Sequence, residues 1–136
     1  MNRLRLIHFI VALACLVSFT SCDKDDDDDV SPNVSLLTAG EWTATGIYFG
    51  DQSLSDDFLE QTGYPITDLS TTFNRDGTYV ESLGSNSVEG SWKYENNERI
   101  IIFDEGSGRE YNVVISKLDE DEFNYIQGGI EYMFAR

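Results

Sequence analysis

The stretch YNVVISKLDEDEFNYIQGGIEYMFAR, residues 111–136, carries the pattern that decides the fold. Tyr111, Val113 and Ile115 occupy every second position, and apolar residues alternate again over residues 130–135. A period of two in aromatic and β-branched residues indicates half-buried β-strands. Gly128-Gly129 lies between two such runs and readily adopts the positive φ of a tight hairpin turn. The stretch therefore predicts three consecutive antiparallel strands.

The same pattern extends back to residue 41. Trp42, Ala44, Gly46 and Tyr48 alternate with their neighbours. Turn-forming sequences separate the later runs: Asn74-Arg75-Asp76-Gly77, Asn96-Asn97, Glu105-Gly106-Ser107-Gly108 and Asp119-Glu120-Asp121. About eight strands are predicted, at residues 41–49, 69–73, 78–83, 87–94, 99–103, 109–118, 122–127 and 130–136. Short connections between evenly spaced strands favour an all-β antiparallel meander, closed as a barrel or packed as a sandwich.

The first connection, residues 50–68, is longer and contains a helical pattern. Its expected helix would present an apolar side made of Leu54, Phe58 and Leu59. Ser53 or Ser55 is the expected N-cap, and Gly63 with Pro65 would end the helix. A helix inserted at this point is expected to lie over one mouth of a barrel.

The N-terminus predicts a secretory signal peptide over residues 1–21. Arg3 and Arg5 precede a mostly apolar run over residues 6–20, which is shorter than the roughly 20 residues of a membrane-spanning helix. Phe19-Thr20-Ser21-Cys22 resembles the lipobox of bacterial lipoproteins, which implies cleavage before Cys22 and lipidation of its thiol. Cys15 is the competing position, but the residues after it are still mostly apolar.

Asp23-Lys24-Asp25 and four further aspartates follow Cys22. Like charges repel one another, so residues 22–35 are expected to form an acidic tether between the lipid anchor and a domain over residues 36–136. The acidic run also resembles a signal that exports lipoproteins to the cell surface in one group of Gram-negative bacteria. The expected location is therefore the outer membrane, at the cell surface, with a periplasm-facing anchor as the alternative.

Composition excludes several functions. A net charge of −16 repels phosphate backbones, so no nucleic-acid binding is expected. The single histidine, His8, and Cys15 would leave with the signal peptide, and Cys22 would be acylated. A mature domain without histidine or free cysteine has no Ser-His-Asp triad, no Cys-His nucleophile and no zinc site of the usual type. We therefore expect a protein that is not an enzyme, uses no cofactor or metal, and is a monomer.

Four segments together resemble the short lipocalin-like domains of bacterial lipoproteins. These are Gly40-Glu41-Trp42, residues 73–79, residues 90–94 and residues 132–136. The first matches the G-x-W start of lipocalins, whose tryptophan closes the base of an up-and-down barrel beneath an arginine from near the last strand. The resemblance implies these roles for Trp42 and Arg136.

A small eight-stranded barrel has room for side chains or for one small ligand. Aromatic content and topology favour a small apolar or amphipathic ligand inside the barrel, lined by Trp92, Tyr94, Tyr111 and Tyr132. The alternative is a filled core and a surface that contacts another envelope protein or a glycan. Acidic pairs such as Asp56-Asp57 and Asp104-Glu105 are expected to be solvated turns rather than catalytic or calcium-binding carboxylates.

Overall fold

A computed structural model of the chain describes residues 30–136. The expected signal peptide and residues 22–29 of the expected tether, Cys22 included, lie outside these residues. The described elements are α2 (Pro32–Leu37), β1 (Glu41–Phe49), β2 (Gln52–Ser53), α3 (Ser55–Thr62), the 3₁₀ turn η1 (Ile66–Asp68), β3 (Leu69–Phe73), β4 (Thr78–Leu83), β5 (Asn86–Glu95), β6 (Ile100–Phe103), β7 (Tyr111–Leu118), β8 (Glu122–Gln127) and β9 (Ile130–Ala135). No helix among the described residues is long and apolar enough to span a membrane.

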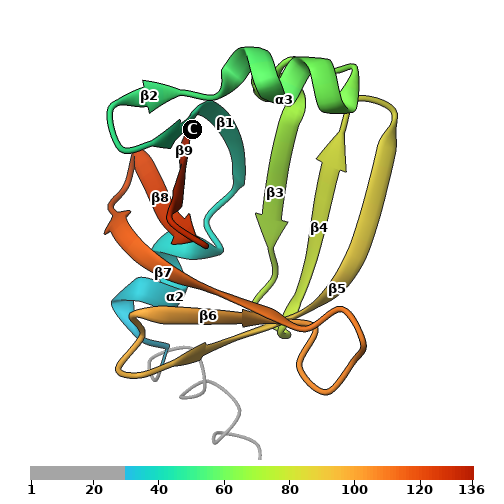
Figure 1. The fold of residues 1–136 in the computed structure, drawn as a ribbon. Helices are drawn as coiled ribbons and strands as arrows, with labels where there is room; N and C mark the ends of the chain where they lie inside the picture. Colours follow the sequence, from blue (N-terminus) through green and yellow to red (C-terminus); the bar gives the residue numbers. More distant parts are fainter. Residues whose placement is uncertain (1–29) are drawn as a thin grey trace, which may run out of the picture. The chain divides into compact units, whose positions relative to one another are not determined.

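The strands form a closed antiparallel barrel (Figure 1). Each strand from β3 to β8 pairs with the strand that follows it in the chain, and β1 pairs with β3. The last strand, β9, closes the barrel by pairing with β1 from Thr43–Ala135 to Phe49–Ile130. A bulge between Ala44 and Gly46 bends β1. This leaves eight strands in the barrel and the two-residue β2, which pairs antiparallel with the end of β1, and it confirms the predicted up-and-down barrel.

The order of connections defines two barrel ends. We call the end with α3 and the turns at residues 84–85 and 128–129 the α3 end. The other, the α2 end, has α2, the remaining turns and Arg136, whose guanidinium donates to the Leu36 carbonyl at 2.8 Å. The loop at residues 104–110 lies away from α3, below β4 and β5 in Figure 1. In Figure 1, α3 crosses the top of the barrel, as expected for the long first connection.

Aromatic side chains fill most of the barrel. Alternate residues of each strand point inward, and the largest fully buried ones are Trp42, Phe73, Phe103, Phe123 and Phe134. Phe123 is central to this set, with its ring 5.7 Å from the Trp42 ring and 5.8 Å from the Phe73 ring. The closing strand pair and the described core lie between Val34 and Ala135, so residues 30–136 contain every strand of the barrel.

The turn residues match the sequence prediction, whereas the N-cap of α3 does not. Asn96, Asn97 and both glycines of Gly128-Gly129 have positive φ, as predicted. Gly63 ends α3 in the left-handed conformation, also as predicted. The N-cap prediction is wrong: the cap residue is Leu54, without a side-chain cap bond. Leu59 is 46% exposed, because only Leu54 and Phe58 of the expected apolar side pack on the core.

Arg136 and Trp42 lie together at the α2 end. The guanidinium carbon is 4.0 Å from the centroid of the indole ring, and Arg136 Nε donates to the Glu120 carbonyl at 2.8 Å. Trp42 Nε1 donates to the carbonyl of Leu37 at 2.9 Å. The last residue of the chain thereby ties the first strand to α2 and to the turn after β7.

We expect Arg136→Met to lower the free energy of unfolding by about 1 to 2 kcal/mol. The change removes a cation–π contact worth about 0.5 to 2 kcal/mol and two hydrogen bonds to carbonyls, while the apolar stem is kept. Urea denaturation of residues 30–136 measures the loss. Arg75→Met, in the exposed turn after β3, is the matched control, and equal losses in the two variants would contradict the closing role of Arg136.

Candidate functional site: the barrel interior at the α3 end

A cavity of about 180 Å³ lies inside the barrel at the α3 end. Its lining comes from α3 and five strands: Phe58, Leu69, Glu81, Leu83, Tyr111, Tyr125, Gln127 and Tyr132. Large aromatics fill the other half of the barrel, whereas at this end Tyr111, Tyr125 and Tyr132 line an open space. The lining is mostly apolar and aromatic with a few polar groups, which is the usual composition of a small-molecule site.

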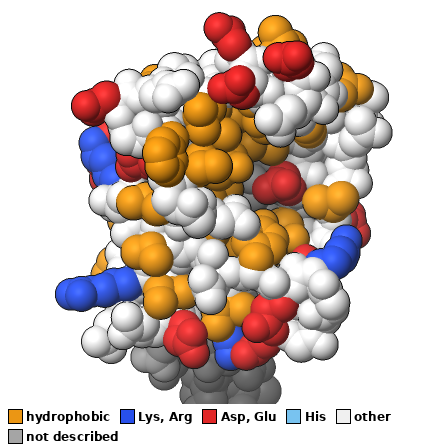
Figure 2. Space-filling view, in the orientation of Figure 1, with side chains coloured by type: hydrophobic (Ala, Val, Ile, Leu, Met, Phe, Trp, Pro, Cys, Tyr) orange, Lys and Arg blue, Asp and Glu red, His pale blue; other side chains and the backbone are white. Residues whose placement is uncertain are grey.

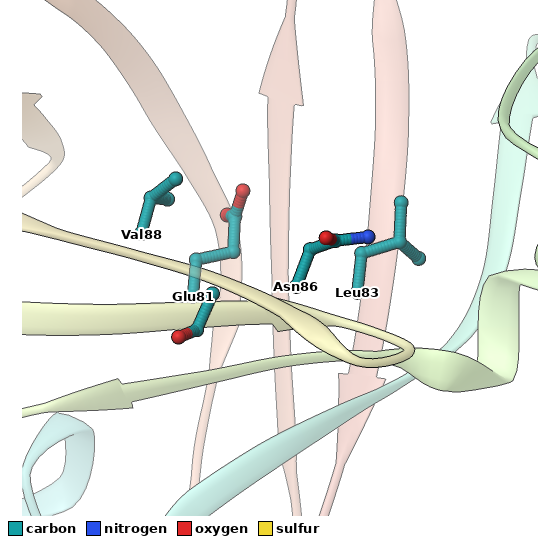
Figure 3. Close-up of a pocket in the computed structure, with 5 residues that line it drawn as sticks. Glu81, Leu83, Asn86 and Val88 are labelled. Atoms are coloured by element: carbon teal, nitrogen blue, oxygen red, sulfur yellow. The ribbon is translucent and has the colours of Figure 1, made fainter.

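A second cavity of about 110 Å³ adjoins the first, because Glu81 and Leu83 line both. Glu81, Leu83, Asn86 and Val88 project from the same side of the β4–β5 hairpin (Figure 3). Val88 is on this inner side and is nevertheless 47% exposed. The two cavities therefore open to solvent along β5.

The opening follows from strand pairing. β6 pairs with β5 only over Trp92–Glu95, so residues 86–90 have no partner strand on that side among the described strands. The barrel is closed by hydrogen bonds near the α2 end and splayed near the α3 end. Figure 2 shows this face of the molecule hollowed, with hydrophobic side chains around an acidic one.

Glu81 is the charged group of the cavity. It lies on β4 between Tyr79 and Leu83 in the period-two pattern, and therefore on the inner face. Removal from water raises the pKa of the Glu81 carboxyl above its ordinary value, and the negative charge of Asp104 raises it further. A hydrogen bond with Thr71, its partner on β3, only partly offsets this rise.

The raised pKa of Glu81 predicts that the carboxylate weakens the fold. A carboxyl whose pKa is raised by folding is favourable to stability below its ordinary pKa of 4.5, and this contribution is lost as the pH rises through the folded value. At pH 7 we therefore expect Glu81→Gln to increase the free energy of unfolding by about 0.5 to 2 kcal/mol, the usual gain from a single stabilising substitution.

Thermal unfolding at pH 7 and at pH 4 tests this prediction. The gain of Glu81→Gln over the wild type should shrink at pH 4, where the wild-type carboxyl is increasingly protonated. Glu89→Gln, on the exposed side of β5, is the matched control and should leave stability within about 0.5 kcal/mol at both pH values. A loss of stability in Glu81→Gln at pH 7 would contradict the sign.

Three tyrosines from β7, β8 and β9 face Glu81. Tyr125 and Tyr132 stack with ring centroids 5.1 Å apart, and Tyr111 stacks on Phe103 at 4.7 Å. Burial raises the pKa of all three phenols, and the charge of Glu81 is the next cause in each. All three are therefore neutral hydroxyls at physiological pH that can donate hydrogen bonds into the cavity.

A buried polar cluster built on Asp104 lies near the Glu81 side of the cavity. Its carboxylate accepts from the Tyr79 hydroxyl at 3.0 Å and from the Ser91 backbone N–H at 3.0 Å. Arg109 Nη2 is 3.9 Å from the same carboxylate. Asp104 has a positive φ of 52°, which turns its side chain back over Gly90. The cluster fixes the point where β5 leaves β6.

Ionisation of the Tyr79 phenol is expected to lower the stability of the fold at alkaline pH. Burial raises the pKa of this phenol from 10 to about 12, and the hydrogen bond to Asp104 adds to the rise. Since the pKa of the phenol is higher in the folded state, the neutral Tyr79 hydroxyl contributes its full stabilisation below pH 10. This stabilisation, roughly 2 to 3 kcal/mol, is lost between pH 10 and pH 12. Urea midpoints measured from pH 8 to pH 12 should fall less steeply for Tyr79→Phe than for the wild type. Equal slopes would contradict the assignment.

The four residues expected to line a pocket separate into two pairs. Tyr111 and Tyr132 line the cavity. Trp92 and Tyr94 lie toward the α2 end, where their rings meet edge to face with centroids 5.4 Å apart. Trp92 Nε1 donates to the Asn74 carbonyl at 2.9 Å, and the Tyr94 hydroxyl donates to the Asn33 carbonyl at 3.2 Å. Both therefore hold the turn after β3 and helix α2 against the barrel.

Sequence reasoning missed Glu81, Leu69, Leu83 and Tyr125. The available signal was the alternation over Thr78–Leu83, which places Glu81 on the same face as Tyr79 and Leu83. Within residues 30–136, no group of three or more His, Cys, Asp or Glu side chains could hold a metal ion. The cavity offers a ligand one carboxylate, one amide, phenol hydroxyls, aromatic faces and apolar side chains.

Comparison with known proteins identifies the fold. No family model and no curated protein match the chain. A lipocalin-like protein from Bacteroides uniformis superposes with a TM-score of 0.53 at 11% identity, over 73% of this chain and 97% of that one. A DUF4847 family protein from Bacteroides vulgatus gives a TM-score of 0.53 at 13% identity, over 74% and 94% of the two chains.

An uncharacterized protein from Bacteroides eggerthii has the same TM-score, 0.53, at 12% identity, over 71% of this chain and 97% of that one. At such low identity these likenesses concern the fold alone. Together with the strand pairing they define the domain as a lipocalin-like barrel.

Proposed function

We propose that the barrel binds one small, mostly apolar ligand in the cavity at the α3 end. The observation that carries this proposal is an open cavity at one end of a barrel whose other end is densely filled. An apolar cavity of about 150 Å³ in another protein is large enough for benzene. The larger cavity here, about 180 Å³, suits a ligand with a single ring or a short branched chain, with the adjoining space for a substituent.

A surface interaction module is the second candidate. Val114 and Ile126 are paired across β7 and β8 on the outer face of the barrel and are 48% and 38% exposed. Such a pair could be part of a contact with another envelope protein. It is much smaller than the patches of a few hundred Å² that mark interaction sites, so the cavity is the stronger basis for function.

Native mass spectrometry of residues 30–136 purified from its own host tests ligand binding. We expect an additional mass that disappears on denaturation, and we expect Leu83→Trp, which fills the cavity, to abolish it. Val114→Trp, on the outer face, is the matched control and should keep the additional mass. A clean apo mass from repeated gentle preparations would overturn the proposal and favour the interaction module.

We propose further that the chain is a lipoprotein anchored through Cys22 and displayed at the cell surface. The support is the lipobox-like segment Phe19–Cys22 and the acidic residues after it. Mass spectrometry of the N-terminal peptide should find acyl chains on Cys22, and Cys22→Ser should remove them while Cys15→Ser does not. Protease shaving of intact cells tests display, and a fully protected domain would contradict it.

A further inference from the structure

We infer that the ligand of this cavity is a small organic amine, whose ammonium group pairs with Glu81 while its apolar body lies against Leu69, Leu83 and the tyrosine rings. The inference rests on the proposed function and narrows it to a chemical class. It starts from the Glu81 carboxylate inside the barrel, which forms no ion pair with a cation among residues 30–136.

The first support is the missing counter-charge of Glu81. The ion pairs among residues 30–136 are Lys93–Glu105, Arg109–Asp104, and Lys117 with Asp119 and Glu122. None of them involves Glu81, and the one charge that acts appreciably on it, Asp104, has the same sign. Buried carboxylates in proteins are normally paired with a cation or bound to a metal. An ammonium group from a ligand would supply the cationic partner that residues 30–136 do not provide.

The second support is the aromatic surround. Tyr125 and Tyr132 stack nearly parallel, at 23°, and line the same cavity as Glu81 together with Tyr111. Aromatic ring faces attract cations, and tyrosine is among the side chains used to bind ammonium ligands. A carboxylate combined with several tyrosines is thus suited to hold an ammonium group by charge on one side and by ring faces on the others.

The third support is that the charge of the protein and the size of the cavity favour small cationic ligands over anionic or long ones. A net charge of −16 raises the concentration of cations near the mouth and lowers that of anions. A fatty acid would bring a second carboxylate toward Glu81, and like charges that close cannot both stay ionised without cost. Its long chain would also exceed cavities of about 180 and 110 Å³. Neutral and anionic amphiphiles are therefore the poorer fit.

Three probes of one size separate these classes: benzylamine, benzyl alcohol and benzoate. They are to be titrated at pH 7.5 into residues 30–136 with protein NMR as the readout, after the spectrum has shown a folded barrel. We expect benzylamine to bind at least tenfold more tightly than benzyl alcohol and benzoate to bind least. The changes in NMR chemical shift on adding each probe should be confined to the residues that line the cavity.

Glu81→Gln, which keeps the shape and removes the charge, should abolish the preference for benzylamine and leave the affinity for benzyl alcohol within about twofold. Glu89→Gln should keep the preference. Equal affinity of the wild type for benzylamine and benzyl alcohol would overturn the amine inference but leave ligand binding standing. A preference that persists in Glu81→Gln would also overturn it, whereas binding of none of the three probes would count against both proposals.

Discussion

Gly90→Ala is expected to destabilise the barrel by about 4 kcal/mol. A Cβ at this position would lie 1.9 Å from Asp104 Oδ1 and 2.7 Å from Tyr79 Cε1. Neither neighbour can move freely, because Asp104 is held by the Tyr79 hydroxyl and by the backbone of Ser91. Overpacking alone costs about 1 to 3 kcal/mol, and a buried carboxylate that loses its donors adds about 1 to 3 kcal/mol.

Urea denaturation of residues 30–136 measures this effect, and Gly108→Ala is its control. Gly108 lies in the turn after β6, and a Cβ there would meet nothing within 4 Å. We expect the control to change the free energy of unfolding by less than about 0.5 kcal/mol. If Gly90→Ala behaves like Gly108→Ala, Asp104 does not occupy the space above Gly90. Combining Gly90→Ala with Asp104→Gly should recover part of the loss.

Phe123→Ala is the second change with a large expected effect, a loss of about 4 kcal/mol. Its side chain is fully buried, and its ring lies within 5.8 Å of the rings of Trp42, Phe73, Tyr125 and Phe134. Truncation of a buried phenylalanine costs about 3 to 5 kcal/mol, since packing is lost and rigid aromatic neighbours refill the space poorly. For a domain with a stability of about 5 to 15 kcal/mol, this removes a large share.

Phe49→Ala is the matched control, because Phe49 is at the edge of β1 and is 59% exposed. We expect it to cost less than about 1 kcal/mol in the same urea experiment. A similar loss in both variants would contradict a core organised around Phe123. Ligand titration of the folded Phe123→Ala protein adds a second readout: a new void nearer the α2 end should increase the affinity for benzene but not for benzylamine.

The fold could be predicted because the meander repeats two simple signals. Alternation located the strands to within one or two residues, from Glu41–Phe49 to Ile130–Ala135. Glycine and asparagine turns set the connections, and their positive φ values confirm the reason. The N-cap of α3 could not be predicted in the same way. A serine caps a helix only if the preceding chain brings it to the position just before the first helical residue, and here Leu54 takes that position directly after β2.

The site was less predictable, for a physical reason. Alternation says that a residue points into the barrel, but not how far along the barrel axis it lies. Tyr94 and Tyr111 are both directed inward, yet one binds the α2 backbone and the other lines the cavity. Glu81 was hidden by composition, since 25 acidic residues make each carboxylate look like part of a solvated surface. Alternation puts it on the face of Tyr79 and Leu83, and the strand register places it opposite Thr71 and Val88, inside the barrel.

The contact of Arg136 with Leu36 has a practical consequence for handling the protein. It places Arg136 beside α2, which begins at Pro32, at the α2 end and away from the mouth of the cavity. An affinity tag, a fluorescent fusion or a biosensor chip linked to either end would leave that mouth unobstructed. Because Arg136 contacts Leu36 in α2, a linker from residue 136 to Pro32 could also give a circularly permuted barrel, with new ends cut at the exposed Gly84-Ser85 turn.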